Sequence, residues 1–329
     1  MPQSILVVGG AGYIGSHMVR TLQHGGYHVA VADTLAGGRR EAVGTAELHV
    51  GDIGDAGFVD QVLATVAPAA VMHFASFIQV GESVSDPARY YRNNVMASQV
   101  LIDGMCAHGV RALVFSSTAA IFGNPDYVPI DEAHPKRPIN PYGRSKLMVE
   151  QMLEDYDHAY GLKSVCLRYF NAAGADPDGE LGECHEPETH LIPLILQVAS
   201  GRRPHIAVYG DDYATPDGTC IRDYIHVEDL CDAHLLALRS LLAGSGSARF
   251  NLGNGSGASV HEVIEAVRRV TGHPVPVVVG KRRAGDPPAL VADSRSARQV
   301  LGWSPRHAAL DTIIEHAWAW ERKHADWAC

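Results

Sequence analysis

The sequence predicts an α/β protein with a Rossmann-type, doubly wound parallel sheet and a smaller C-terminal α/β substrate domain. Short apolar strands alternate with helical segments through the first half of the chain, as crossover connections between parallel strands require. A glycine-rich turn over residues 9–15 joins the first strand to the first helix, which is the context of a dinucleotide-binding turn. The 329 residues are enough for one large α/β domain and a smaller one.

Each element of the first half follows from local pattern. Short, mostly apolar runs predict strands over residues 4–8, 28–32, 48–50, 70–73, 112–116 and 164–168. Helical patterns lie between them, over residues 14–24, 56–67, 88–108 and 142–160. Residues 175–189 are rich in Gly, Pro and acids and predict a loop, followed by a helix over residues 191–200. We therefore place the first domain at residues 1–175 and the second at 176–329, with segments near 223–250 returning to the first.

Composition excludes several classes of function. Hydrophobic residues make up 46% and charged residues 19%, which is typical of a globular enzyme. A net charge of −10 argues against nucleic acid and anionic membranes as partners. The six cysteines are scattered without a C-x-x-C pair, which suits a reducing compartment. No run approaches the ~20 apolar residues of a membrane span, so we expect a cytoplasmic protein.

The glycine-rich turn is the first candidate site. Gly9, Gly12 and Gly15 are spaced so that a pyrophosphate can approach the N-terminus of the following helix. Asp33 ends the second strand, 18 residues after Gly15, where a carboxylate accepts hydrogen bonds from ribose hydroxyls and repels a 2′-phosphate. NAD is thus expected over NADP, although two arginines at 39–40 weaken that preference. Asp52 follows the third strand as an adenine ligand or, alternatively, as a helix N-cap.

A tyrosine and a lysine form the second candidate site. Tyr142 and Lys146 are four residues apart and share one face of the predicted helix. The ammonium, together with a positively charged nicotinamide ring, is expected to lower the phenol pKa from about 10 toward neutrality, so that the phenolate takes a proton from a substrate hydroxyl. The hydroxyl run 116–118 follows an apolar strand at the edge where α/β sheets bind ligands. One of its hydroxyls can bond the reacting oxygen, or the run is simply a polar strand end.

With these motifs the chain resembles the extended short-chain dehydrogenase/reductases that act on nucleotide sugars, and most closely their epimerases. The resemblance covers nearly the whole chain. It is carried by residues 12–17 (GYIGSH), 73–75 (HFA), 80–83 (VGES), 90–95 (YYRNNV), 145–151 (SKLMVEQ), 167–171 (LRYFN), 222–227 (RDYIHV), 251–253 (NLG) and 282–286 (RRAGD). The C-terminal motifs are the more specific to the epimerases.

The resemblance assigns roles position by position. Thr118 takes the place of the catalytic hydroxyl, Tyr142 of the base and Lys146 of its partner. The residues implied to bind NAD are Gly9, Gly12, Tyr13, Ile14, Gly15, Asp33, Asp52, Ile53, Phe74, Ala75, Asn93, Lys146 and Tyr169. Those implied to bind a UDP-sugar are Thr118, Tyr142, Asn171, Leu191, Ala207, Tyr209, Arg222, Tyr224, Arg283 and Asp286. The two arginines are suited to clamp a diphosphate.

The implied reaction is the reversible C4 epimerisation of UDP-glucose and UDP-galactose through a transient 4-keto sugar. Three alternatives remain: epimerisation of a UDP-N-acetylhexosamine or of UDP-xylose/arabinose, a nucleotide-sugar 4,6-dehydratase, and a non-catalytic NAD-binding protein. Dehydratases need an acid pair directly after the catalytic hydroxyl, where this chain has two alanines. Leu290 stands at the position that gates sugar size. The resemblance also implies a homodimer built on the helices at 88–108 and 142–160.

Two positions depart from the family pattern, and one segment raises metal binding. Ile78 stands where a lysine is common, and His190 replaces an asparagine next to Leu191, which affects the expected sugar contacts. Residues 184–190 read C-H-E-P-E-T-H, with the histidines one residue further apart than in H-E-x-x-H. Pro187 disfavours the helix that would align such ligands. We therefore expect a loop here and no metal.

Overall fold

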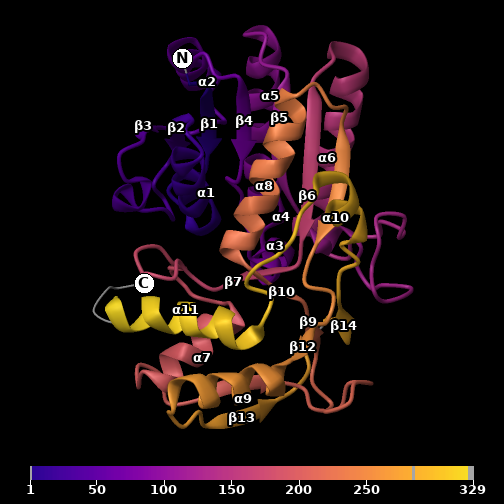
Figure 1. The fold of residues 1–329 in the computed structure, drawn as a ribbon. Helices are drawn as coiled ribbons and strands as arrows, with labels where there is room; N and C mark the ends of the chain where they lie inside the picture. Colours follow the sequence, from indigo (N-terminus) through magenta and orange to yellow (C-terminus); the bar gives the residue numbers. More distant parts are fainter. Residues whose placement is uncertain (1, 284–285, 325–329) are drawn as a thin grey trace.

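A seven-stranded, fully parallel sheet forms the larger part of the computed structural model, which describes residues 2–283 and 286–324 (Figure 1). Its strands stand in the order β11-β6-β5-β4-β1-β2-β3. They are β1 (Ser4–Val8), β2 (His28–Asp33), β3 (Glu47–Val50), β4 (Ala70–His73), β5 (Ala112–Thr118), β6 (Lys163–Tyr169) and β11 (Ala248–Leu252). The predicted fold class is confirmed, because every neighbouring pair of these strands is parallel.

Helices cover both faces of this sheet, and each face has its own core. One face packs against α1 (Tyr13–His24), α8 (Val227–Leu242) and α10 (Arg295–Leu301). The other packs against α2 (Ala56–Val66), α5 (Ala97–Ala107) and α6 (Pro141–Tyr160). In Figure 1, α8 lies across the sheet beside α1. The central strands β1, β4 and β5 are buried along almost their whole length and are mostly apolar, which is why their pattern could be recognised in the sequence, whereas the edge strand β3 is only partly buried.

The segment predicted as one long helix over 88–108 differs from the prediction. It begins as α4 (Pro87–Tyr90), widens into a π-helical stretch (Tyr91–Met96) and continues as α5. It is preceded by the short helix α3 (Val80–Ser85), and Asp86 caps α4 by accepting a hydrogen bond from the amide of Arg89. Single π-helical turns often occur at functional sites because they re-aim the side chains that they carry.

The smaller part of the molecule lies at the carboxyl edge of the sheet, below it in Figure 1. Its core is formed by helices α7 (Leu191–Ala199), α9 (Val260–Thr271) and α11 (Leu310–Lys323). Short strands surround them: β7 (Asn171–Ala173) with β10 (Tyr224–His226), β8 (Ile206–Tyr209) with β13 (Val277–Gly280), and β9 (Ile221–Arg222) between β12 (Ala258–Ser259) and β14 (Ala289–Leu290). Short 3-10 turns occur at Arg40–Val43 and Ala119–Ile121.

Three segments beyond residue 175 lie on the large sheet. Helix α8 packs on α1, and β11 pairs with β6 at the sheet edge, in the region from which a return was predicted. Helix α10 also contacts α8 and β11, and that return was not predicted. The boundary at 175 itself stays a prediction. Within the described residues, no helix is both long and apolar enough to cross a bilayer.

Candidate active site

The carboxyl ends of four adjacent strands, β6, β5, β4 and β1, bring the predicted site residues to one edge of the sheet. In the strand register Val8 lies opposite His73, and Thr118 lies opposite Tyr169. The chain leaves β1 toward β2 on one side and returns as β4 on the other, so a crevice opens at this point of the sheet. The glycine turn, the segment after β4 and the hydroxyl run after β5 therefore face a common space.

The glycine turn has the shape that a dinucleotide requires. Gly9 has φ +82°, and a Cβ atom there would lie 2.4 Å from the backbone nitrogen of Ala75. A Cβ on Gly15 would lie 2.0 Å from the carbonyl oxygen of Gly9. Gly12 differs: it caps α1, and a Cβ there would meet only that same oxygen, at 3.6 Å. Two glycines thus close the turn, while the third leaves the helix N-terminus open to a phosphate.

Asp33 is held toward the glycine turn by two backbone hydrogen bonds. Its Oδ2 accepts from the amide of Ala11 at 2.9 Å, and its Oδ1 accepts from the amide of Leu35 at 2.8 Å. Each carboxylate oxygen keeps a further lone pair for a ribose hydroxyl. The fixed carboxylate at the end of β2 is the arrangement expected of a residue that selects a ribose over a 2′-phosphate.

The alternative interpretation of Asp52 as a helix N-cap is wrong. The cap of α2 is Asp55, whose carboxylate accepts from the amides of Gly57 and Phe58. Asp52 instead accepts from the amide of Gly54 at 2.8 Å, in a tight turn after β3. A carboxylate in that turn remains available to a base, so the adenine role of Asp52 stays a prediction.

The three hydroxyls after β5 have different partners, and this distinguishes them. Ser116 Oγ lies 2.7 Å from the Tyr169 hydroxyl, and Ser117 Oγ donates to Glu150 Oε1 at 2.5 Å. Thr118 Oγ1 accepts from an amide in the following turn at 3.1 Å, which leaves its proton to donate elsewhere. Of the run 116–118, Thr118 is the residue equipped to contact a substrate oxygen.

Thr118 and Tyr142 are hydrogen-bonded to each other, and this bond favours the phenolate. Burial acts more strongly in the opposite direction and raises the pKa of the Tyr142 phenol. The expected lowering toward neutrality is therefore not a property of the chain alone. The positive charge of an oxidised nicotinamide ring is the other contribution that is expected to lower the pKa of this phenol.

Lys146 anchors the tyrosine helix to the strand. Its Nζ donates to the carbonyl oxygen of Ser116 at 2.9 Å and lies 4.9 Å from the ring centre of Phe115. Burial lowers the pKa of Lys146 to about 7, and the Glu150 carboxylate partly opposes that shift. Glu150 lies one helical turn further along α6, and it pairs with the buried Arg168 at 2.6 Å. Its place four residues after Lys146 was the signal that sequence reasoning did not use.

The π-helical stretch places Asn93 beside the same helix. Asn93 Nδ2 donates to Asn94 Oδ1 at 2.9 Å, and Asn94 Nδ2 donates in turn to Ser145 Oγ at 3.0 Å. Asn94 also accepts from the amide of Phe77 at 2.9 Å, which ties this stretch to the segment after β4. The NAD role of Asn93 stays a prediction, but its side chain is part of a fixed network.

Four of the residues predicted to hold the UDP-sugar converge in the smaller part of the molecule. Arg222 Nη2 lies 3.6 Å from Asp286 Oδ1, and Arg283 Nε lies 3.9 Å from Asp286 Oδ2. The guanidinium of Arg283 stacks 4.2 Å above the Tyr209 ring centre. Because Arg222 also donates to two backbone carbonyls at 2.9 Å, its direction is fixed. Two arginines close to one carboxylate form a cationic site for a diphosphate.

The other predicted sugar ligands lie on the same short elements. Ala207 shares a face of β8 with Tyr209, while Ile206 and Val208, which alternate with them, are buried in the core. Asn171 lies opposite Tyr224 in the β7–β10 pair, and Leu191 is the first residue of α7. The roles of these residues remain predictions.

Leu290 lies next to residues from two parts of the predicted site, the strand that carries Arg222 and the turn after Thr118. It lies opposite Arg222 in the β14–β9 pair and packs against a small core that contains Ala119, Ile121 and Phe122. Those residues form the turn directly after Thr118. Leu290 therefore contacts both the turn after Thr118 and the strand that carries Arg222, and its role in limiting sugar size stays a prediction. The departure at Ile78 is exposed.

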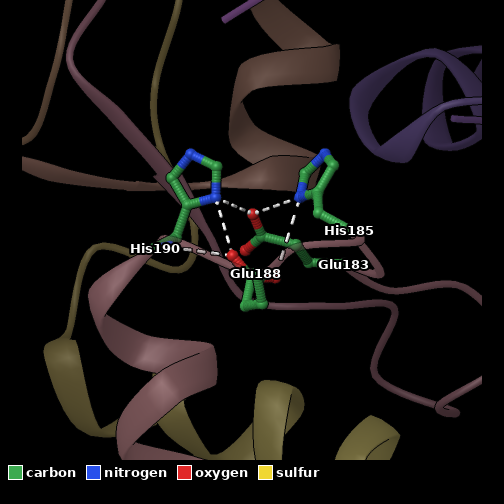
Figure 2. Close-up of side chains that lie close together, drawn as sticks. All are labelled: Glu183, His185, Glu188 and His190. Atoms are coloured by element: carbon green, nitrogen blue, oxygen red, sulfur yellow. Dashed lines mark hydrogen bonds and ion pairs between the residues drawn. The ribbon is translucent and has the colours of Figure 1, made fainter. Parts of the chain in front are cut away.

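The loop predicted over 175–189 is confirmed as non-helical, but its side chains form a cluster that sequence reasoning missed. His185 and His190 converge on Glu183 and Glu188, with the four ligand atoms all within 4.8 Å of one another (Figure 2). The alternation of acid and histidine at 183, 185, 188 and 190 was the available signal. The helical H-E-x-x-H template did not reveal it, because a loop brings these positions together by a different path.

Comparison with known proteins agrees with this geometry. Residues 5–253 match the model of a family described as "NAD dependent epimerase/dehydratase family". The chain is 52% identical over 321 residues to the UDP-glucose 4-epimerase of Halalkalibacterium halodurans, covering 98% of this chain and 96% of that protein. The crystal structure of UDP-glucose 4-epimerase from Brucella ovis in complex with NAD is 51% identical, with TM-score 0.94 and coverage of 96% and 97%. That from Bifidobacterium longum in complex with NAD+ and UDP is 37% identical, with TM-score 0.92 and coverage of 98% and 99%.

Proposed function

Since the chain belongs to the NAD dependent epimerase/dehydratase family, we propose that it is an NAD-dependent UDP-sugar 4-epimerase that interconverts UDP-glucose and UDP-galactose. One observation carries the proposal. The hydrogen-bonded Thr118 and Tyr142 lie beside Lys146, in a chain that is about half identical over nearly its whole length to UDP-glucose 4-epimerases. Fold alone would not support this, because one fold serves many chemistries.

The residues of the glycine turn, Asp33 and the segment after β4 fit NAD, because the N-terminus of α1 is open and the carboxylate is fixed beside it. Bound NAD⁺ accepts a hydride from C4 of the sugar and, once reduced, returns it. Tyr142 takes the proton from O4 as that hydride leaves and gives it back on return. Thr118 donates to the same oxygen, and the nearby Lys146 ammonium favours the deprotonated phenol.

Inversion at C4 requires the 4-keto sugar to present its other face before the hydride returns. Arg222 and Arg283 provide a fixed attachment for the diphosphate, so the sugar can turn while the nucleotide stays bound. The same Tyr142 then serves both directions, and the cofactor leaves each turnover unchanged. Binding through the nucleotide rather than the sugar is what allows both hexoses to react.

Dehydration is the competing reaction, since it starts with the same oxidation at C4. The position after Thr118 holds Ala119, which is buried, followed by Ala120. Neither side chain carries an acid that can drive the elimination of water. A non-catalytic NAD-binding protein is the other competitor, and it has no need of the connected Thr118, Tyr142 and Lys146. Other UDP-sugars, including those with N-acetyl groups, remain alternative substrates for the same chemistry.

We further propose a homodimer and a cytoplasmic location. Helices α5 and α6 contact each other, and Tyr156 on α6 donates to Asp103 on α5 at 2.5 Å. Met96, the last residue of the π-helical stretch before α5, and Met148 on α6 are both exposed. An exposed apolar surface on two adjacent helices suits a four-helix interface with a second copy. Met148→Glu should then yield monomers in sedimentation velocity. A cytoplasmic location follows from the use of NAD and a nucleotide sugar.

The first test is to incubate the pure protein with UDP-galactose without added NAD and to resolve the products by chromatography. Formation of UDP-glucose up to equilibrium, with no accumulation of NADH, is expected of an epimerase that retains its cofactor. Appearance of a 4-keto-6-deoxy product would instead establish a dehydratase. No conversion even with NAD added, repeated with UDP-N-acetylgalactosamine and UDP-xylose, would leave the non-catalytic alternative.

A further inference from the structure

We propose that Glu183, His185, Glu188 and His190 form a binding site for a divalent metal ion of the Zn²⁺ class, which fastens the loop before α7. The site is separate from the reacting residues and plays no part in the chemistry at C4. The argument rests on the positions of four ligand atoms, on the burial of two carboxylates and on the elements that the loop joins.

The nitrogen–oxygen separations in this cluster are close to those of a tetrahedral site, and the four ligand atoms all lie within 4.8 Å of one another. His185 Nδ1 lies 3.2 Å from Glu183 Oε1 and 3.7 Å from Glu188 Oε2. His190 Nδ1 lies 2.8 Å from the same Glu183 oxygen. Metal–ligand bonds of about 2.0–2.1 Å in a tetrahedron place neighbouring ligand atoms about 3.3 Å apart. The observed separations bracket that value, and Figure 2 shows both imidazoles turned toward the two carboxylates.

Two carboxylates of this cluster are buried, and buried negative charges need a cation beside them. The side chains of Glu183 and Glu188 are only 7% and 5% exposed. Two buried carboxylates require two positive charges nearby, since an uncompensated buried charge costs several kcal/mol. Two imidazolium protons or one divalent cation meet that need equally, and in both cases the four side chains and their cation are neutral overall. The cluster is thus balanced for a metal that replaces two protons.

Glu188 is prearranged as a ligand. Its Oε1 accepts from the amides of Thr189 and His190 at 2.7 and 2.8 Å, which fixes the carboxylate and leaves Oε2 facing His185. Within the described residues, the buried Nδ1 of His185 has no hydrogen bond of good geometry, although two carboxylate oxygens are near it. An imidazole nitrogen held among carboxylates in this way is a typical ligand for Zn²⁺.

The loop that carries the four residues contacts several other elements, and these contacts indicate what a bound metal would hold together. The Glu183 carbonyl accepts from Trp320 Nε1 at 3.0 Å, which attaches this end of the loop to α11. His190 is the N-cap of α7, and the predicted substrate residue Leu191 follows it. The His185 ring meets the Tyr13 ring edge-on at 6.5 Å between centres, and Tyr13 belongs to the glycine turn. A metal here would hold α7, α11 and the cofactor turn in one arrangement.

The test uses the full chain without a histidine tag. The protein is equilibrated with Zn²⁺, freed of excess ion and measured by elemental mass spectrometry. We expect about one Zn²⁺ per chain. Glu188→Gln and His185→Gln should weaken binding by at least about tenfold, since loss of even an outer-shell partner costs that much. The control is His108→Gln, which removes a histidine from an ion pair with Asp60 far along the chain, and which should bind as wild type does.

Two measurements keep the proposal open to refutation if a variant fails to fold. Wild-type protein should melt at a temperature that rises with Zn²⁺ concentration, because a ligand of the folded state stabilises it. Co²⁺ in place of Zn²⁺ should give the visible absorption of a four-coordinate ion. Wild-type protein that binds no Zn²⁺, or variants that bind it as wild type does, would show that the four residues form an ion-pair network only.

Discussion

Lys146 Nζ donates a 2.9 Å hydrogen bond to the carbonyl oxygen of Ser116, and this contact helps to join helix α6 to the end of strand β5. Thr118 lies two residues beyond that carbonyl, and Tyr142 lies one turn before the lysine. The contact therefore fixes the distance between the hydroxyl and the phenol that form the proposed proton path. A lysine used in this way serves position as well as charge.

Tyr142→Phe should lower turnover by about 10²–10⁴-fold, the usual contribution of a general base, because no other group is proposed to take the O4 proton. Its unfolding temperature should stay close to that of wild type, since the ring is retained. Initial rates of UDP-galactose conversion and thermal unfolding measure the two effects. Tyr160→Phe, at the exposed end of the same helix, is the control and should leave the rate unchanged. Wild-type turnover in Tyr142→Phe would refute the assignment of the base.

Glu150→Ala should destabilise the fold by roughly 3–5 kcal/mol, because it leaves Arg168 buried and unpaired. The same change removes a hydrogen-bond acceptor from Ser117 and the carboxylate that raises the pKa of Lys146. Urea denaturation measures the loss. Glu154→Ala is the matched control on the same helix: Glu154 forms an exposed pair with Arg249, worth at most about 1 kcal/mol. Equal effects of the two changes would contradict this account.

Two alanine substitutions in the glycine turn should separate cofactor binding from folding. Gly12→Ala adds a methyl group that faces open space above the α1 N-terminus, with the nearest atom 3.6 Å away. The protein should fold normally and lose NAD. Gly15→Ala places a methyl group 2.0 Å from the Gly9 carbonyl oxygen, so both folding and NAD binding should suffer. Retained nucleotide and unfolding temperature are measured for each. Full NAD retention by Gly12→Ala would show that the cofactor does not approach this helix end.

Six of the seven strands of the large sheet were predicted from the sequence, and the reasons are local. Strand β11 was not predicted, and the roles of the reacting residues stay predictions. The central strands of the sheet are buried and mostly apolar, and Tyr142 and Lys146 are neighbours on any helix. The carboxyl end of β5 then had to bring Thr118 to the same edge. These predictions needed only the periodicity of apolar residues and the order of strands and helices along the chain. Tertiary packing acts in the same direction as these local preferences.

What the sequence did not reveal depends on contacts between distant segments or on irregular backbone. The pairing of Glu150 with Arg168 joins α6 to β6, and no spacing rule indicates it. The π-helical stretch at Tyr91–Met96 has the composition of an ordinary helix. The four residues from Glu183 to His190 meet through a loop path that no periodic template describes. The raised pKa of Tyr142 reflects burial, which was invisible before the fold was known.

Four buried histidines should make the folded protein sensitive to mild acid. Burial lowers the pKa of His17 and His234 to about 4, of His73 to about 3 and of His226 to about 2. The unfolded chain takes up these protons near pH 6.5, whereas the folded chain does so only near those lower values. The contribution of these four histidines to stability is therefore complete above pH 6.5 and is lost as the pH falls below it. Between pH 6.5 and 5.5, each of these histidines lowers the free energy of unfolding by about 1 kcal/mol, and the four together lower it by roughly 4 kcal/mol.

Urea denaturation at several values of pH from 7.5 to about 5.5 measures this dependence. The slope of the unfolding free energy against pH reports the number of protons that unfolding takes up. His234→Gln should reduce that number by about one, because a buried amide does not titrate. A stability that does not change between pH 7.5 and 5.5 would mean that these imidazoles take up protons within the folded protein, against the burial that surrounds them.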